Sequence, residues 1–127
     1  MVLPLLESDL LTVMRACTDG TLEDTEVKFA DKHACCVILA SNGYPTAYKK
    51  GLPMQFTQEA LEHTYIAGAK LQEGILVTSG GRVTGTTAIA SSLEEAVKEA
   101  YRLSDGVTFE GAYRRSDIGK RALMANK

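Results

Sequence analysis

The sequence lacks any long hydrophobic run, any secretion signal and any marked excess of charge of one sign. No apolar stretch approaches the roughly 20 residues that a membrane-spanning helix needs. Residues 1–6 carry neither a basic segment nor a small-residue cleavage site. The 14 basic and 16 acidic residues give a formal net charge of −2, which argues against a general nucleic-acid-binding protein. We therefore expect a globular protein without a membrane or nucleic-acid partner.

Cysteine is also scarce, with Cys17, Cys35 and Cys36 making an odd count of 3. Their spacing fits no metal-ligand motif, so no metal site is predicted. Cys35 and Cys36 are adjacent in an apolar strand and should point to opposite faces. We expect structurally buried free thiols, which suit a reducing compartment and a cytoplasmic protein.

What the sequence does contain is one segment, residues 78–106, whose pattern is typical of turn, strand, cap and helix in succession. Gly80 and Gly81 can form a bend at positive φ without steric cost. β-Branched residues predict a strand over 82–89, and Gly85 within it indicates a close approach by another part of the chain. Ser92 and Glu95 form a capping box. Apolar residues at helical spacing then predict a helix that ends at a glycine: Leu93, Ala96, Val97, Ala100, Tyr101 and Gly106.

The rest of the chain gives shorter patterns. Apolar spacing predicts a helix over residues 4–19, with Pro4 in its first turn and Gly20 as its stop. A continuous apolar run predicts a central strand over 34–40 that is covered on both faces. The other expected elements are a strand at 25–30, a turn at 41–45, a short helix or loop at 59–63, a hairpin of 65–71 and 75–78 with a three-residue loop, a strand at 107–109, and a helix from about residue 118 capped by residues 116–117.

These elements add up to a single unit. The chain of 127 residues is large enough to bury its own core, and it contains no internal repeat, low-complexity stretch or linker. We predict the α+β class, with a mixed or antiparallel sheet flanked by helices.

Six short segments occur in a fixed order along the chain. Each segment alone is a weak indication of a protein family, but the ordered set is highly specific. They are Leu-Pro-Leu-Leu-Glu-Ser-Asp-Leu at 3–10, Ala-Ser-Asn-Gly-Tyr-Pro at 40–45, Tyr-Lys-Lys-Gly at 48–51, Ala-Gly at 67–68, Thr-Ser-Gly-Gly-Arg-Val at 78–83, and Phe-Glu-Gly-Ala-Tyr-Arg-Arg-Ser-Asp-Ile-Gly at 109–119. Together they resemble the C-terminal part of phosphoribosylamine–glycine ligase, also called glycinamide ribonucleotide synthetase, an ATP-grasp enzyme. The resemblance covers nearly the whole chain.

The resemblance implies a piece of a longer enzyme, in which residues 1–20 are the last helix of the ATP-grasp region and residues 21–127 are the C-terminal domain. The family joins glycine to 5-phosphoribosylamine through a glycyl phosphate formed with ATP, and the product is glycinamide ribonucleotide of de novo purine biosynthesis. This chain has no GxxxxGK[ST] loop and no clustered carboxylates on one strand. We therefore expect ATP and magnesium to bind the missing ATP-grasp lobes, which would be this chain's partner, and the fragment alone to be inactive.

The resemblance also points to residues that contact substrate, with no catalytic residue expected in this chain. Arg82, presented by Gly80 and Gly81, could bind the 5′-phosphate of phosphoribosylamine through two parallel hydrogen bonds. Backbone N–H groups of Gly80, Gly81 and Gly43 could add anion-binding dipoles, and Lys70 is a weaker candidate. The alternative interpretation is that Arg82 pairs with an acid or caps a carbonyl, and that the glycines only permit the bend.

Three positions in two segments depart from the family pattern. The family usually has His-Ala-Gly-Thr where residues 66–69 of this chain are Ile-Ala-Gly-Ala, and commonly a large aliphatic residue where this chain has Thr84. If the histidine and threonine touch substrate in relatives, that contact is absent or rearranged here. The basic pair Arg114 and Arg115 is expected to form surface ion pairs.

A second class of function, a non-catalytic docking module, also fits the N-terminal segment. The expected first helix carries more apolar surface than one small sheet covers, and such a patch usually marks an interface. Its apolar residues are Leu3, Leu5, Leu6, Leu10 and Leu11. Packing of this helix wholly on its own sheet would remove the main support for docking.

Overall fold

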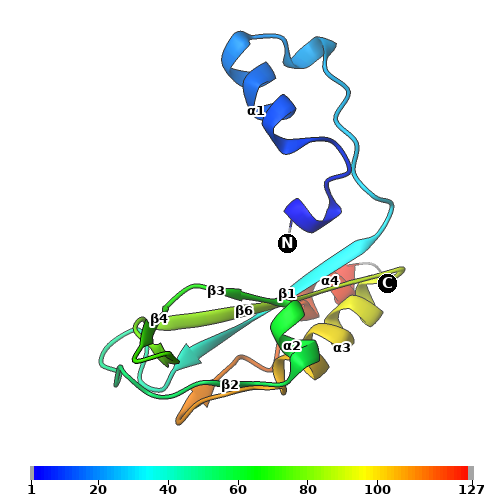
Figure 1. The fold of residues 1–127 in the computed structure, drawn as a ribbon. Helices are drawn as coiled ribbons and strands as arrows, with labels where there is room; N and C mark the ends of the chain where they lie inside the picture. Colours follow the sequence, from blue (N-terminus) through cyan, green and yellow to red (C-terminus); the bar gives the residue numbers. More distant parts are fainter. Residues whose placement is uncertain (1, 126–127) are drawn as a thin grey trace.

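A computed structural model describes residues 2–125, and its centre is a four-stranded antiparallel sheet in the order β3-β6-β1-β8 (Figure 1). The two long strands, β1 (His33–Ser41) and β6 (Arg82–Ala90), pair from His33 opposite Ala90 to Leu39 opposite Thr84. Short strands extend the sheet on both sides, β3 (Thr64–Ile66) beside β6 and β8 (Ala112–Tyr113) beside β1. This arrangement confirms the predicted α+β class.

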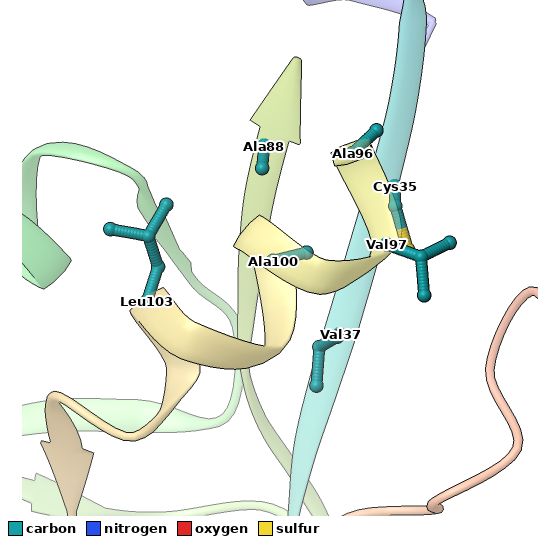
Figure 2. Close-up of a cluster of buried hydrophobic side chains, with 7 residues drawn as sticks. All are labelled: Cys35, Val37, Ala88, Ala96, Val97, Ala100 and Leu103. Carbon is teal, nitrogen blue, oxygen red and sulfur yellow. The ribbon is translucent and has the colours of Figure 1, made fainter. Parts of the chain in front are cut away.

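The helix α3 (Leu93–Ser104) covers one face of this sheet (Figure 1). Ser92 begins it, because its side chain accepts a hydrogen bond from the backbone N–H of Glu95 at 3.2 Å. Small residues on the helix let it lie close to the two long strands. The resulting core contains Cys35, Val37, Ala88, Ala96, Val97, Ala100 and Leu103 (Figure 2).

A second core lies where the ends of the long strands meet two small ribbons. One ribbon pairs β2 (Gln55–Phe56) with β7 (Val107–Thr108), and the other pairs β4 (Ala69–Gln72) with β5 (Ile75–Thr78). The short helices are α2 (Gln58–Glu62) and α4 (Lys120–Ala125). The buried members of this core are Leu39, Met54, Ala60, Val83, Val107 and Phe109.

The helix of the N-terminal segment stands away from the sheet, on the side opposite α3, whereas the turn at Leu3–Leu5 lies close to β1 (Figure 1). The segment consists of the 3-10 turns η1 (Leu3–Leu5) and η2 (Leu22–Asp24) around α1 (Leu10–Asp19). Two backbone hydrogen bonds close it, from Glu7 N–H to the Lys28 carbonyl at 3.0 Å and from Ala30 N–H to the Leu5 carbonyl at 2.8 Å. Among residues 2–125, no helix is both long enough and apolar enough to cross a membrane.

Several predicted elements form as expected. The strands at 34–40, 82–89 and 107–109, the helix after Ser92 and the short helix near 59–63 are all present. Gly20 ends α1 with φ of 73°, which is the left-handed geometry expected of a helix stop. A side chain on Gly85 would lie 3.0 Å from the Cys36 sulfur, which confirms the close approach predicted there.

The prediction of a helix over residues 4–19 is wrong in its beginning. The helix starts at Leu10, because Asp9 caps it by accepting a hydrogen bond from Thr12 N–H at 2.7 Å. Pro4 lies in the separate turn η1. The predicted strand at 25–30 is also wrong, since only an isolated bridge from Phe29 to Leu6 forms there.

The hairpin prediction fails in its first strand and in its loop. The expected strand over 65–71 is divided at Ala67 and Gly68, so that β3 pairs with β6 and β4 pairs with β5. The loop has two residues, not three, and Glu73 and Gly74 both adopt positive φ, 52° and 79°. This geometry is typical of the two-residue turns that follow the twist of a hairpin.

Caps and thiols need three further corrections. The last helix begins at Lys120 rather than 118, after Gly119 with φ of 81°, and residues 116–117 do not cap it. The capping box of α3 forms only in half, because the Glu95 carboxylate accepts from Ser91 at 2.6 Å instead. Cys17 is exposed rather than buried, and Cys36 is half-buried.

Strand β1 is not covered on both faces as its apolar run predicted. Ile38 is 39% exposed, because α3 covers only the face that carries Cys35 and Val37. The strands β2 and β8 were missed by the sequence patterns, since each is two residues long and forms only by pairing with a distant strand. One face of the central sheet is therefore open.

Acid is expected to weaken the contact between α2 and α3. The Arg102 guanidinium donates to both Glu59 and Glu99, and these hydrogen bonds hold the pKa of both carboxyls below the ordinary value of 4.5. A lowered carboxyl pKa adds stability above the unfolded-state pKa and loses it as pH falls through the folded-state pKa. Arg102→Gln should therefore lower the free energy of unfolding at pH 7, and this difference should shrink as the pH falls through the folded-state pKa of the two carboxyls.

Urea unfolding followed by circular dichroism across this pH range measures the effect. Lys98→Gln on the same helix is the matched control, because Lys98 forms no ion pair within the described residues. The interpretation would be contradicted if the free energies of unfolding of Arg102→Gln and of the unchanged chain differed as much at the lowest pH as at pH 7.

Candidate functional site

Three loops meet where β1 ends and β6 begins. The backbone N–H of Ser41 donates to the Gly81 carbonyl at 2.8 Å, and its hydroxyl donates to the Gly80 carbonyl at 3.0 Å. The N–H of Asn42 donates to the Gly111 carbonyl at 3.0 Å. The turn after β1 is thereby fixed to the glycine pair before β6 and to the loop before β8.

The glycine pair is required by close packing, not by its φ angles. Neither Gly80 nor Gly81 lies at positive φ, so the predicted conformational reason is wrong. A side chain on Gly81 would overlap the ring of Tyr44, and one on Gly80 would lie 3.0 Å from the Cα of Gly68. The N–H of Gly80 is also bonded to the Gly68 carbonyl at 2.9 Å, so it is not free for an anion as predicted.

Arg82 is exposed at the start of β6 and has no hydrogen-bond or ion-pair partner within residues 2–125. The Arg82 side chain therefore neither pairs with an acid nor caps a carbonyl within these residues. Its side chain borders two clefts on the open face of the sheet. One cleft, of about 420 Å³, is also lined by Ala67 and Gly68, and the other, of about 340 Å³, is lined mainly by apolar residues that include Ile38.

The other two arginines at the second cleft are neutralised. Arg114 donates to the Asp105 carboxylate at 2.6 Å and lies 5.2 Å from the centre of the Tyr101 ring. Arg115 pairs with Asp117 at 2.7 Å, which holds the pKa of that carboxyl below its usual value. The predicted surface ion pairs are confirmed. Arg82 is thus the free guanidinium at this cleft, as far as the described chain extends.

The remaining predicted residues do not join Arg82. Gly43, with φ of 90°, lines a separate cleft of about 430 Å³ together with Lys49 and Glu110. Lys70 is exposed on β4 and lines none of these three clefts. The structure therefore gathers Gly80, Gly81 and Arg82 at one place and leaves the two other candidates apart.

Tyr44 is the residue that the sequence patterns missed. The sequence patterns place it in the turn at 41–45 and in the segment 40–45 but give it no role at the site, and its side chain lines both clefts beside Arg82. The ring rests on Gly81, and this contact joins residues far apart in sequence, so no periodicity or spacing reveals it. In the sequence, the glycine pair was the available signal of this contact, because a glycine can mark a place where another part of the chain comes close to the backbone.

Two of the three departures from the family pattern are neighbours in the sheet. Ile66 on β3 lies directly opposite Thr84 on β6. The Thr84 hydroxyl is buried and has no partner within the described chain. Thr84 also lines the cleft that Arg82 shares with Gly68, whereas Ile66 lines neither cleft beside Arg82, and Ala69 lies on β4 opposite Thr78.

The described residues contain no cluster of metal-ligating side chains. Within residues 2–125, no group of three or more His, Cys, Asp or Glu side chains is close enough to hold a metal ion. We assign no step through ATP or magnesium to this chain, and the expected absence of both from it stays a prediction.

The fold and site define a small α+β domain that presents a free arginine between two clefts on an open sheet. A sequence profile of the family described as phosphoribosylglycinamide synthetase, C domain, matches residues 34–121. The chain belongs to this family.

Comparison with individual proteins supports the same family membership. The chain is 44% identical to phosphoribosylamine–glycine ligase of Caldanaerobacter subterraneus over 92% of its own length and 28% of that protein. It is 45% identical to the bifunctional purine biosynthetic protein PUR2,5 of Pichia angusta, over 96% of its length and 16% of the relative. The crystal structure of phosphoribosylamine–glycine ligase from Thermotoga maritima is similar, with a TM-score of 0.69 and 33% identity over 83% of this chain and 27% of that one. The chain thus spans less than a third of each relative.

The contact between Gly81 and Tyr44 makes a testable prediction for the geometry of the site. Gly81→Ala should destabilise the fold, because the added methyl group overlaps the ring. In a chain that already carries Tyr44→Ala, the same change should cost less, giving a coupling free energy of about 0.5–3 kcal/mol. Urea unfolding of the two single variants, the double variant and the unchanged chain measures it. Additive effects would show that the ring does not rest on Gly81.

Proposed function

We propose that this chain is the C-terminal domain of a phosphoribosylamine–glycine ligase and forms one wall of the phosphoribosylamine site. The observation that carries the proposal is the free guanidinium of Arg82, held between two clefts at the end of the sheet. Membership of the family and the names of the relatives give the reaction class. The role of Arg82 is to bind the 5′-phosphate of the substrate.

The guanidinium suits this role because its fixed fork can donate two parallel hydrogen bonds to a phosphate. Gly80 and Gly81 support it by letting the turn after β1 lie against the backbone next to Arg82. Within the ligase reaction, this chain binds and orients the sugar phosphate. The activation of glycine by ATP, with magnesium, belongs to the ATP-grasp part of the enzyme.

The division of the chain into two parts remains part of the proposal. Residues 1–20 were expected to belong to the ATP-grasp region and residues 21–127 to the C-terminal domain. The backbone contacts between 5–7 and 28–30 support moving that boundary to about residue 31, since they join the whole segment 2–30. The family match, which begins at residue 34, supports the same position.

The N-terminal segment supplies the surface toward the rest of the ligase. Helix α1 does not pack on the sheet (Figure 1). It leaves Leu11 and Met14 exposed. An apolar patch of this kind usually marks an interface. The family match favours an interface within one enzyme over an independent docking module. The free thiols support a cytoplasmic location for such a ligase.

The phosphate role of Arg82 is tested in a full-length ligase that contains this domain. Arg82→Met should raise the KM for phosphoribosylamine about 10- to 100-fold, the loss expected for hydrogen bonds to a charged group, and leave the KM for ATP nearly unchanged. Steady-state kinetics measure both constants. Arg121→Met, on exposed α4, is the matched control. An unchanged KM for phosphoribosylamine in Arg82→Met would exclude the contact.

The isolated chain of 127 residues is expected to be catalytically silent, because the proposed nucleotide machinery lies outside it. Incubation with ATP, magnesium, glycine and phosphoribosylamine should give no glycinamide ribonucleotide by chromatography. The same assay with a complete ligase serves as the positive control. Turnover by the isolated chain would overturn the assignment of ATP activation to another domain.

A further inference from the structure

Tyr44 stands beside Arg82 on the open face of the sheet and lines the clefts on both sides of that arginine. Its side chain is 44% exposed, and its phenol forms no hydrogen bond with the part of the chain that the structure describes. An exposed tyrosine next to a free arginine offers two donors to one anion, a guanidinium and a hydroxyl.

The position of the tyrosine is well defined although it is exposed. The ring packs against Gly81, and the backbone N–H of Tyr44 donates to the Ser41 carbonyl at 3.1 Å. Ser41 is itself bonded to the glycine pair before Arg82. The ring of Tyr48 lies 6.2 Å away at a tilt of 57°. The Tyr44 ring and the backbone that carries Arg82 are therefore joined through the same turn, and the ring loses little freedom when a ligand binds.

We infer that the Tyr44 phenol is a second binding group for the phosphate monoester that Arg82 holds. This inference rests on the proposed function of Arg82 and adds a residue to the same site. The neutral hydroxyl donates a hydrogen bond to a phosphate oxygen, while the ring forms a wall for the sugar. Tyr113 also lines the apolar cleft but does not line the cleft on the side of Gly68. Tyr44 alone among the described tyrosines borders both.

Titration of the 127-residue chain with ribose 5-phosphate, and separately with inorganic phosphate, tests the inference. Backbone amide shifts of residues 80–84 in nuclear magnetic resonance spectra report binding, and shifts elsewhere report whether each variant is folded. Tyr44→Phe keeps the ring on Gly81 and removes only the hydroxyl. It should weaken the binding of ribose 5-phosphate about 3- to 10-fold, which is the loss of affinity expected when one hydrogen bond is removed. Tyr65→Phe, an exposed tyrosine on β3, is the control and should bind as the unchanged chain does.

Arg82→Met separates this inference from the proposed function. If Arg82→Met abolishes binding and Tyr44→Phe binds as tightly as the unchanged chain, the phenol is no binding group and only the role of Arg82 stands. If Tyr44→Leu weakens binding but Tyr44→Phe does not, the ring only packs, and the inference is overturned. If the unchanged chain gives no saturable shift with either ligand, Tyr44→Phe and Tyr65→Phe are compared in the full-length ligase. An unchanged KM for phosphoribosylamine in Tyr44→Phe then overturns the inference, and an unchanged KM in Arg82→Met overturns the phosphate role of Arg82.

Discussion

The antiparallel pairing of β1 with β6 is the interaction on which the rest of the structure depends. It gives α3 a surface to cover, and the seven-residue core between them joins segments that are far apart in sequence (Figure 2). It also sets the site. The pairing shifts by one residue between Leu39 and Ala40, and at this irregularity Val83 enters the second core while neighbouring Arg82 stays exposed. Irregularities of this kind redirect side chains where strands end.

The second determining feature is that the sheet is covered on one face only. A two-layer domain normally buries the apolar face of its sheet against helices, and α3 does so here. The other face keeps Ile38 partly exposed and lets its side chain approach Gly85 closely. Both clefts beside Arg82 open on this face. The uncovered surface is therefore where a ligand or another part of a larger enzyme can reach the arginine.

Sequence reasoning succeeded where structure is local. The strand that begins at Arg82 and the helix capped by Ser92 follow from neighbours within a few residues. It failed where a contact between residues far apart in sequence determines where an element begins or ends. The strand expected to run through Gly68 breaks there because Gly80 packs against it, and a capping aspartate, Asp9, overrode the apolar spacing before it. For the site, Gly-Gly-Arg located the arginine, but its wall, Tyr44, depends on a contact that only the folded chain creates.

An arginine on an open face is only half of a strong phosphate site. In water the attraction between two unit charges about 4 Å apart is roughly 1 kcal/mol, whereas at a less solvated protein surface it is several times larger. A single exposed guanidinium therefore holds a phosphate weakly, and a surface that covers the clefts would strengthen it by removing water. The relatives that match this chain are more than three times its length, so each has other domains that can supply such a surface. Under the function proposed above, the open sheet, the free Arg82 and the exposed α1 have one explanation: they are surfaces for contact with the remainder of a ligase.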